Sequence, residues 1–284
     1  MDAIHILNTG KSDCIILESE GQFAMIDAAE DNDNPRGFRS LAFRGYEQEI
    51  TNWVLSHCRG QDGKATFAFL LGTHAHSDHL GGFDTLLANP DIVFQKAYLK
   101  PYTAKGIFPM EVHFWDNREV YEQTVQALRE REVPIVEQFD GEQVRLGNFR
   151  LTFLNAEDRR YRLRHGENCH SVVTLVEKDG TRALLVGDLN YKSGGEKRIM
   201  QKVGKVNLLK VGHHGTVGST SAAFAKAMSP EIAVVTNTRS GAFPDVKLTL
   251  KRVGAKVYYT ADCGGVTVLV DGGGKLTVKT GIMP

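Results

Sequence analysis

One stretch, Thr73-His74-Ala75-His76-Ser77-Asp78-His79-Leu80-Gly81-Gly82, constrains the fold more than any other part of this sequence. It follows Phe67–Leu71, an apolar run that is typical of a buried strand, and it leads into Leu80–Leu87, which has the pattern of a helix. Polar side chains that gather where a strand ends and a helix begins are typical of ligand sites in α/β proteins. We therefore expect an α/β fold with a site at this strand end.

The spacing of the polar residues in this stretch favours metal binding. His74 and His76 are two residues apart, so in an extended chain they point to the same side and can bind one ion. Asp78 and His79 follow at the turn and can reach a second ion. Imidazole and carboxylate favour zinc, with iron or manganese as lesser options. The alternative, a polar loop with histidines facing water, rarely produces so tight a pattern.

Length and charge limit the remaining classes. The chain has 284 residues without a linker or low-complexity stretch, which predicts one domain over residues 1–284. Lys and Arg number 34, as do Asp and Glu, so no overall basic field attracts nucleic acid. Net charge therefore does not favour nucleic acid as the partner, although a local basic patch would still allow it.

Four cysteines without a close pair indicate free thiols. The first residues lack the pattern of a signal peptide, and no apolar run reaches the length of a membrane span. These features predict a cytoplasmic protein with no membrane partner, and no feature indicates the oligomeric state.

The apolar pattern predicts two groups of strands, each followed by helices. Strands are expected at 3–8, 14–18, 23–26, 67–71, 92–99, 136–139, 143–146, 149–155, 171–177, 183–186, 206–211, 232–236, 257–259, 265–270 and 275–280. Helices are expected at 46–55, 80–88, 117–132 (with Asp116 as the N-cap), 196–203, 219–228 and 245–253. Segment 101–115 is expected to be irregular. Two facing sheets with helices outside would satisfy this order.

Two distant positions repeat the arrangement of an apolar strand followed by a possible ligand. Asp188 directly follows the apolar run 184–186. It could be an ordinary turn residue. Beside a dinuclear site it becomes a candidate bridging ligand, because a carboxylate between two ions about 3.5–4 Å apart offsets their repulsion.

His213 and His214 follow the apolar run 208–211. Adjacent histidines cannot usually bind one ion equally well. We expect His214 to be the ligand, because the glycine after it, Gly215, lets the backbone approach closely. His213 is then a candidate to donate a proton, and the alternative interpretation is a hydrated histidine pair.

These residues together resemble the metallo-β-lactamase-fold hydrolase superfamily, and Phe23–Ala28 is similar to the end of its first conserved strand. The resemblance implies an αββα four-layer sandwich of two mixed sheets, with two zinc ions per chain at one edge. It implies the following ligands: His74, His76 and Asp188 for one metal, and Asp78, His79, Asp188 and His214 for the other.

The chain departs from many family members before the predicted strand at 171–177. The pattern Asn168-x-x-Ser171 resembles a subgroup that holds the nuclease-like domain of bacterial competence proteins and the bacterial phosphorylcholine esterase. In that subgroup an additional histidine ligand is absent and water fills its position. His170 is nevertheless a candidate for this position. Cys169 is expected to be a small buried residue.

Two segments bear on the substrate. The basic run 159–165 could neutralise a phosphate or a polyanion, or could be a solvated loop. The rings of Tyr102, Phe108, Phe114 and Trp115 could enclose a quaternary ammonium group, or could pack a long loop against the core. The stretch that begins at Trp115 is also similar to part of the phosphorylcholine esterase.

The best-supported function is hydrolysis of a small or choline-bearing phosphodiester by a hydroxide held between two zinc ions. Asp78 would orient the hydroxide, and His213 would protonate the leaving oxygen. One alternative is a nuclease that cleaves single-stranded DNA or RNA. Another is a scaffold that binds metal without catalysis, which the complete ligand set disfavours.

Overall fold

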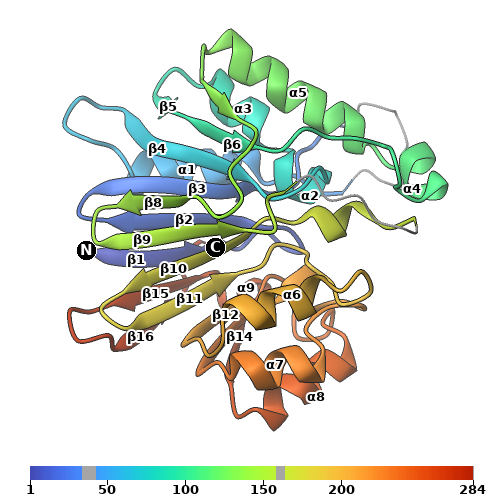
Figure 1. Ribbon diagram of the computed structural model, residues 1–284. Helices are drawn as coiled ribbons and strands as arrows, with labels where there is room; N and C mark the ends of the chain where they lie inside the picture. The colour runs from blue at the N-terminus through green and yellow to red at the C-terminus, as the bar shows by residue number, and fades with distance from the viewer. Residues whose placement is uncertain (34–42, 158–163, 284) are drawn as a thin grey trace.

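The chain forms two facing β-sheets with helices on both outer sides, as Figure 1 shows. The computed structural model describes residues 1–33, 43–157 and 164–283. The predicted αββα four-layer α/β sandwich is thereby confirmed. Within the described ranges, none of the helices has the length and apolar character that a membrane span requires.

The first sheet is antiparallel on one side and parallel on the other. Within the described residues its order is β16-β15-β1-β2-β3-β4-β6-β7, and β5 pairs with the beginning of β4. The strands β3, β4, β6 and β7 run parallel. The bounds are β1 Asp2–Ile6, β2 Cys14–Ser19, β3 Gln22–Ala28, β4 Ala65–Gly72, β5 Ile92–Phe94, β6 Ala97–Leu99, β7 Ile135–Val136, β15 Val266–Val270 and β16 Leu276–Thr280.

The second sheet has the order β14-β13-β12-β11-β10-β9-β8, again with a parallel part, β11 to β14. Its bounds are β8 Gln143–Leu146, β9 Phe149–Leu154, β10 Val173–Lys178, β11 Thr181–Leu185, β12 Leu208–Lys210, β13 Ile232–Val235 and β14 Lys256–Tyr259. The carboxyl ends of parallel strands in one sheet lie at one edge, so β11, β12 and β13 bring their following residues together.

The helices divide between the two outer faces (Figure 1). The first sheet is covered by α1 Glu47–His57, α2 Ser77–Leu80, α3 Phe83–Ala88 and α5 Asn117–Glu130. The second is covered by α6 Gly195–Lys202, α7 Ala222–Met228 and α8 Pro244–Arg252. The other helical segments given for the described residues are α4 Pro109–Phe114, α9 Thr260–Cys263 and the 3-10 turns η2 Glu167–His170 and η3 Gly212–Gly215.

An aromatic cluster joins the two sheets across the central core. Phe153 of β9 lies 5.9 Å from Phe69 of β4, 4.8 Å from Tyr98 of β6 and 5.5 Å from Phe139, measured between ring centroids. All four side chains are buried. Aromatic rings at such distances add stabilisation to the burial of apolar area.

The predicted strand 92–99 was wrong, because the structure has two short strands there. The pairing of β3 with β4 shifts register, so that Phe23 lies opposite Phe67 and Ala24 opposite Phe69. Ala68 is the extra residue in β4, and it separates the part of β4 that pairs with β5 from the part that pairs with β6. The two short strands nevertheless pair with β4 at the same offset, Ala65 with Ile92 and Leu70 with Ala97, on either side of the interruption at Gln95 and Lys96.

Three further expectations were corrected. Segment 101–115 is not irregular throughout, because α4 begins at Pro109, a residue that suits the first turn of a helix. The strand expected at 136–139 is only Ile135–Val136, which pairs with β6 at the edge of the sheet. Asp116 does occupy the N-cap position of α5, but its side chain makes no capping hydrogen bond.

We predict that Phe153→Ala lowers the free energy of unfolding by about 3–5 kcal/mol, because it leaves a cavity between the sheets. Urea denaturation followed by circular dichroism measures the change. Leu248→Ala is the matched control: this α8 side chain is 45% exposed and its loss should cost less than about 0.5 kcal/mol. Equal effects of the two substitutions would contradict the packing described above.

Candidate metal centre between the two sheets

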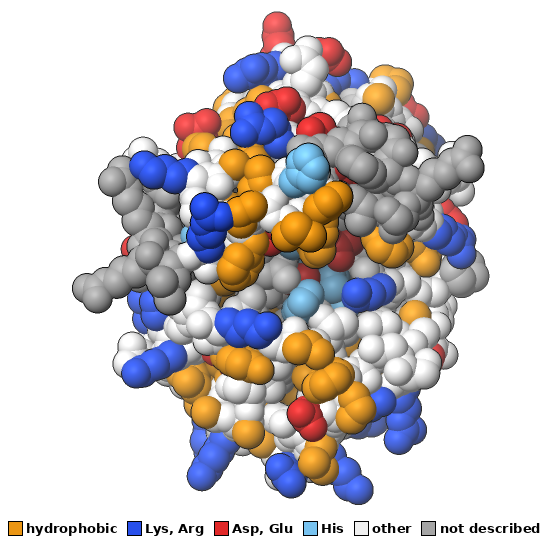
Figure 2. Space-filling view, turned by 90° about the vertical axis from the view of Figure 1, so that its right-hand side faces the viewer, with side chains coloured by type: hydrophobic (Ala, Val, Ile, Leu, Met, Phe, Trp, Pro, Cys, Tyr) orange, Lys and Arg blue, Asp and Glu red, His pale blue; other side chains and the backbone are white. Residues whose placement is uncertain are grey.

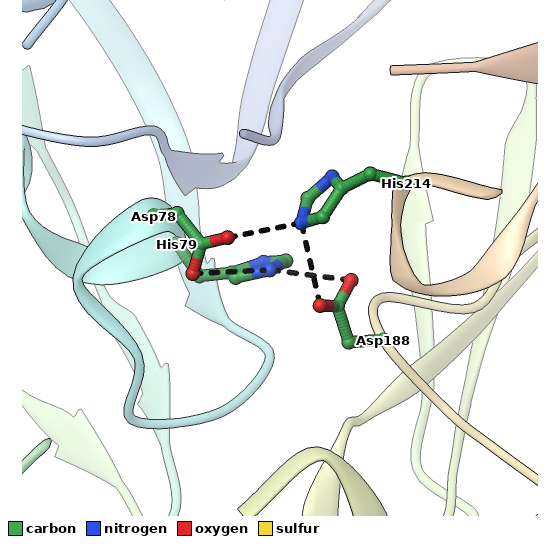
Figure 3. Close-up of side chains that lie close together, drawn as sticks. All are labelled: Asp78, His79, Asp188 and His214. Atoms are coloured by element: carbon green, nitrogen blue, oxygen red, sulfur yellow. Dashed lines mark ion pairs between the residues drawn. The ribbon is translucent and has the colours of Figure 1, made fainter. Parts of the chain in front are cut away.

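Four potential metal ligands converge where strands of both sheets end. Asp78 and His79 lie on α2, after β4, whereas Asp188 follows β11 and His214 lies in η3, after β12. Figure 3 shows that the four side chains point toward one another. Their potential ligand atoms all lie within 4.8 Å of one another.

Asp188 lies between the two histidines and presents a different oxygen to each. Its Oδ1 is 3.3 Å from Nε2 of His79, and its Oδ2 is 3.3 Å from Nε2 of His214. Oδ2 of Asp78 is 3.1 Å from the same nitrogen of His214 (Figure 3). Both oxygens of Asp188 are thus directed at the group that it forms with Asp78, His79 and His214.

The convergent atoms fit a divalent metal. Nε2 of His79, Oδ1 of Asp188 and Nε2 of His214 are buried and have no hydrogen-bond partner. Leaving such polar atoms unsatisfied costs free energy, so a native protein normally pairs them with a group or an ion. Two imidazoles and two carboxylates form a donor set that zinc accepts.

A second pair of convergent nitrogens lies beside this cluster. Nε2 of His74 is 3.1 Å from Nδ1 of His76, and both rings are buried. The rings of His74 and His79 are 4.1 Å apart between centroids. The structure therefore brings all six predicted ligands together, in a four-residue and a neighbouring two-residue group.

The ring nitrogens that face away from the centre are held by neighbouring groups. Nδ1 of His79 is 2.7 Å from Oδ2 of Asp27, a residue of β3. Nδ1 of His214 is 3.0 Å from Oγ1 of Thr236, which follows β13. Such contacts orient a histidine and fix which nitrogen is available to a metal.

A buried ion pair lies beneath the centre. Lys210 of β12 is fully buried and donates hydrogen bonds to Oδ2 of Asp13 and, over 3.1 Å, to the backbone oxygen of Gly187. Oδ1 of Asp13 is 3.3 Å from Nδ1 of His214, and Nζ of Lys210 is 3.9 Å from Oδ1 of Asp188. The pair thus connects the β1–β2 loop of one sheet to two ligands carried by the other.

The carboxylates of the centre are ionised despite their burial. Burial alone would raise the pKa of Asp188, but the charges of His214 and His79 outweigh it and hold the pKa well below its usual range. Burial is likewise outweighed at Asp78, where His79 and His214 lower the pKa to about 2. Both carboxylates are therefore negatively charged near neutral pH.

The backbone of η3 separates the roles of the two adjacent histidines. Both His213 and His214 have φ of 49°, in the left-handed region, and the turn directs them differently. The side chain of His214 is fully buried in the centre, whereas that of His213 is 27% exposed, with Nε2 3.9 Å from Oδ2 of Asp188. A Cβ at Gly215 would lie 2.9 Å from Val235, so this close approach requires glycine.

The segment around η2 supports the centre but contributes no ligand in the structure. Oγ of Ser171 accepts a hydrogen bond from the backbone nitrogen of Asp188 over 3.1 Å. His170 does not point at the ligands: its Nε2 lies 2.7 Å from Nε2 of His165, and burial lowers its pKa to about 3. Cys169 is buried, as predicted.

Helix α4 and the residues flanking it form an apolar surface beside the centre. The side chains of Phe108, Met110, Phe114 and Trp115 are 48%, 68%, 42% and 42% exposed. The ring of Trp115 lies 4.8 Å from that of His76. Figure 2 shows the corresponding face, where hydrophobic side chains gather beside histidines and acidic groups.

The other substrate-related predictions have mixed outcomes. Tyr102 is only partly exposed and packs beside Tyr121, with ring centroids 6.2 Å apart, so it supports the loop. Most of the basic run 159–165 lies outside the described residues. Of its last two residues, Arg164 is exposed and His165 is buried.

Sequence reasoning missed several groups around the ligands. Lys210 carried a signal, since it is a charged residue at the end of an otherwise apolar strand. Asp13, Thr236 and Glu111 carried none, because a lone polar residue in a turn or short helix has no distinctive pattern.

Comparisons with known proteins agree with this geometry. The family model described as "Beta-lactamase superfamily domain" matches residues 47–236. ComE operon protein 3 of Bacillus subtilis (strain 168) is 30% identical over 168 residues, which are 58% of this chain and 19% of that protein. Recombination protein 2 of Haemophilus influenzae is 35% identical over 106 residues, 36% of this chain and 13% of that protein. The matches thus span less than a fifth of these relatives.

A solved structure shares the fold. The metallo-β-lactamase fold protein YhfI from Bacillus subtilis superimposes with a TM-score of 0.54 over 91% of this chain and 96% of that one, at 10% sequence identity. The strand order, the ligand cluster and the family match all lead to one assignment. The chain belongs to the β-lactamase superfamily and has the metallo-β-lactamase fold of its hydrolases.

Proposed function

We propose that this metallo-hydrolase is a phosphodiesterase that uses a dinuclear zinc centre, with a small or choline-bearing phosphodiester as its substrate. The observation that carries the proposal is the convergence of six imidazole and carboxylate side chains, three of whose atoms are buried without partners. The family match supports hydrolysis and a divalent metal. The diester specificity, the number of ions and zinc itself are the proposed part.

In this proposal, some residues bind the metal ions and another residue transfers a proton. His74, His76 and Asp188 would hold one ion, and Asp78, His79, Asp188 and His214 the other. The chemistry that two bound zinc ions would supply is activation of water and stabilisation of negative charge on the phosphoryl oxygens. Asp78 is partly exposed, with 27% of its side chain accessible, so it can also orient the attacking water.

His213 is the candidate proton donor to the leaving oxygen. Its ring is partly accessible and lies close to Asp188, whereas the other histidines of the centre are buried. Burial lowers the pKa of His213 and Asp188 opposes this change. The net effect lowers the pKa of His213. A phosphodiester anion bound beside the ring would oppose this lowering and so would favour the protonated form that the role requires.

A nuclease is the second candidate function. One of the curated relatives is named for recombination, a process that acts on DNA. The sequence of the segment around Asn168 and Ser171 also resembles the nuclease-like domain of competence proteins. The balance of 34 basic and 34 acidic residues weakens this candidate without removing it.

We predict that Asp188→Ala loses bound metal and hydrolytic activity together, because the proposed assignment gives this carboxylate to both ions. Metal content after zinc loading is measured by mass spectrometry, and hydrolytic activity is measured on the same sample. Asp245→Ala, an exposed position at the start of α8, is the control and should retain both. Full zinc content in Asp188→Ala would contradict the bridging assignment.

We predict that His213→Ala keeps its metal and lowers kcat by about 10²–10⁴-fold, the usual contribution of a general acid. The matched variant His214→Ala should instead lose metal, since its buried Nε2 faces Asp78 and Asp188. Zinc content and steady-state kinetics of the two variants distinguish the roles. If His213→Ala lost an ion, the assignment within the pair would be wrong.

The substrate class is tested with the zinc-loaded protein on p-nitrophenyl phosphorylcholine, bis-p-nitrophenyl phosphate and a labelled single-stranded DNA. An EDTA-stripped sample is the control. We expect EDTA-sensitive hydrolysis with a preference for the choline ester, because Trp115 and its neighbours offer aromatic faces beside the centre. Faster cleavage of DNA would favour the nuclease, and no EDTA-sensitive activity would argue against phosphodiester chemistry.

A further inference from the structure

Helix α4 reaches the candidate metal centre through one acidic side chain. Oε1 of Glu111 lies 3.0 Å from Nε2 of His76. The contact is enclosed, since the side chains of His76 and Glu111 are only 6% and 12% exposed. A hydrogen bond between a carboxylate and an imidazole is strong in such surroundings, because little water competes for either group.

The carboxylate of Glu111 is itself held in place by two neighbouring elements. Its Oε1 accepts hydrogen bonds from Nδ2 of Asn117, over 3.1 Å, and from the backbone nitrogen of Glu167, over 2.9 Å. Asn117 begins α5 and Glu167 begins η2. The position of the Glu111 carboxylate is therefore fixed by donors from two other elements.

This contact completes a pattern among the histidines of the centre. In His74, His79 and His214, Nδ1 faces a neighbouring side chain and Nε2 faces the centre. In His76 the two nitrogens are exchanged, because Nε2 faces Glu111 and Nδ1 lies 3.1 Å from Nε2 of His74. A proton held on Nε2 by Glu111 leaves Nδ1 unprotonated and free to bind a metal.

We propose that Glu111 is a positioning residue that fixes the ring and the tautomer of His76 for metal binding. The groups behind the other histidines lie in or directly after strands β3, β4 and β13, whereas Glu111 lies on α4, beside its exposed aromatic side chains. The contact thereby links the position of α4, which carries this apolar surface, to the position of His76 and of the ion that it would bind. This inference rests on the proposed metal-dependent function.

The test compares Glu111→Gln with Glu111→Ala by zinc titration against a competing fluorescent chelator. Glutamine keeps an oxygen that can accept the three hydrogen bonds and removes only the negative charge. Alanine removes the acceptor oxygen as well as the charge. We expect one of the two zinc-binding steps to weaken by about 10–100-fold, with the larger loss in Glu111→Ala. The other step, which belongs to the four-residue group around Asp188, should change by less than twofold.

Three controls separate this role from general damage. Glu122→Gln removes an exposed carboxylate of α5 and should leave both steps unchanged. The metal-free Glu111→Gln protein should melt within a few degrees of the parent. The absorption spectrum of the cobalt-substituted protein should change for one ion only, since only His76 is affected.

The outcomes distinguish the inference from the proposed function. If the parent protein binds two zinc ions and Glu111→Ala binds both with unchanged affinity, Glu111 does not position His76. Equal weakening of both steps would also contradict the inference, because it would indicate a structural effect. If the parent binds no zinc at all, the proposed function itself fails, whatever the variants do.

Discussion

The candidate centre depends on the burial of charge where the two sheets meet. Asp13, Asp27 and Asp188 are almost fully buried within one small region, and an unpaired buried charge costs several kcal/mol. Lys210 offsets part of this cost: it binds Asp13 and lies 3.9 Å from Asp188. The ion pair joins the β1–β2 loop to β12. The geometry of the candidate ligands therefore depends on how the two sheets pack against each other.

A second organising feature is that the two ring nitrogens of each histidine have different contacts. One ring nitrogen is held by a neighbouring residue, and the other faces the centre. Asp27 and Thr236 provide this support within the sandwich, and Glu111 provides it from α4. Because the orientations of His76, His79 and His214 are set by residues distant in sequence, the centre is preorganised only when the chain is folded. The exposed aromatic side chains of α4 then lie next to a defined position of His76.

The fold and the family indicate the type of reaction, but they give little information about the substrate. The superfamily match covers residues 47–236, the segment that carries all six candidate ligands, and it supports a hydrolase. The curated relatives align over less than a fifth of their own length, so their activities do not transfer directly. Specificity depends on the surface around the centre, where α4 contributes apolar rings and η3 contributes the accessible His213.

The sequence by itself determined the order of strands and helices and the positions of the ligands, because apolar periodicity and the spacing of His74, His76, Asp78 and His79 are local properties. It did not reveal the break at Gln95 and Lys96 between β5 and β6. Nor did it reveal that Asp13 pairs with Lys210 or that Glu111 contacts His76. Only the tertiary structure decided these contacts, because each joins residues far apart in sequence, and the contact of Asp13 with Lys210 also requires the two sheets to be packed together.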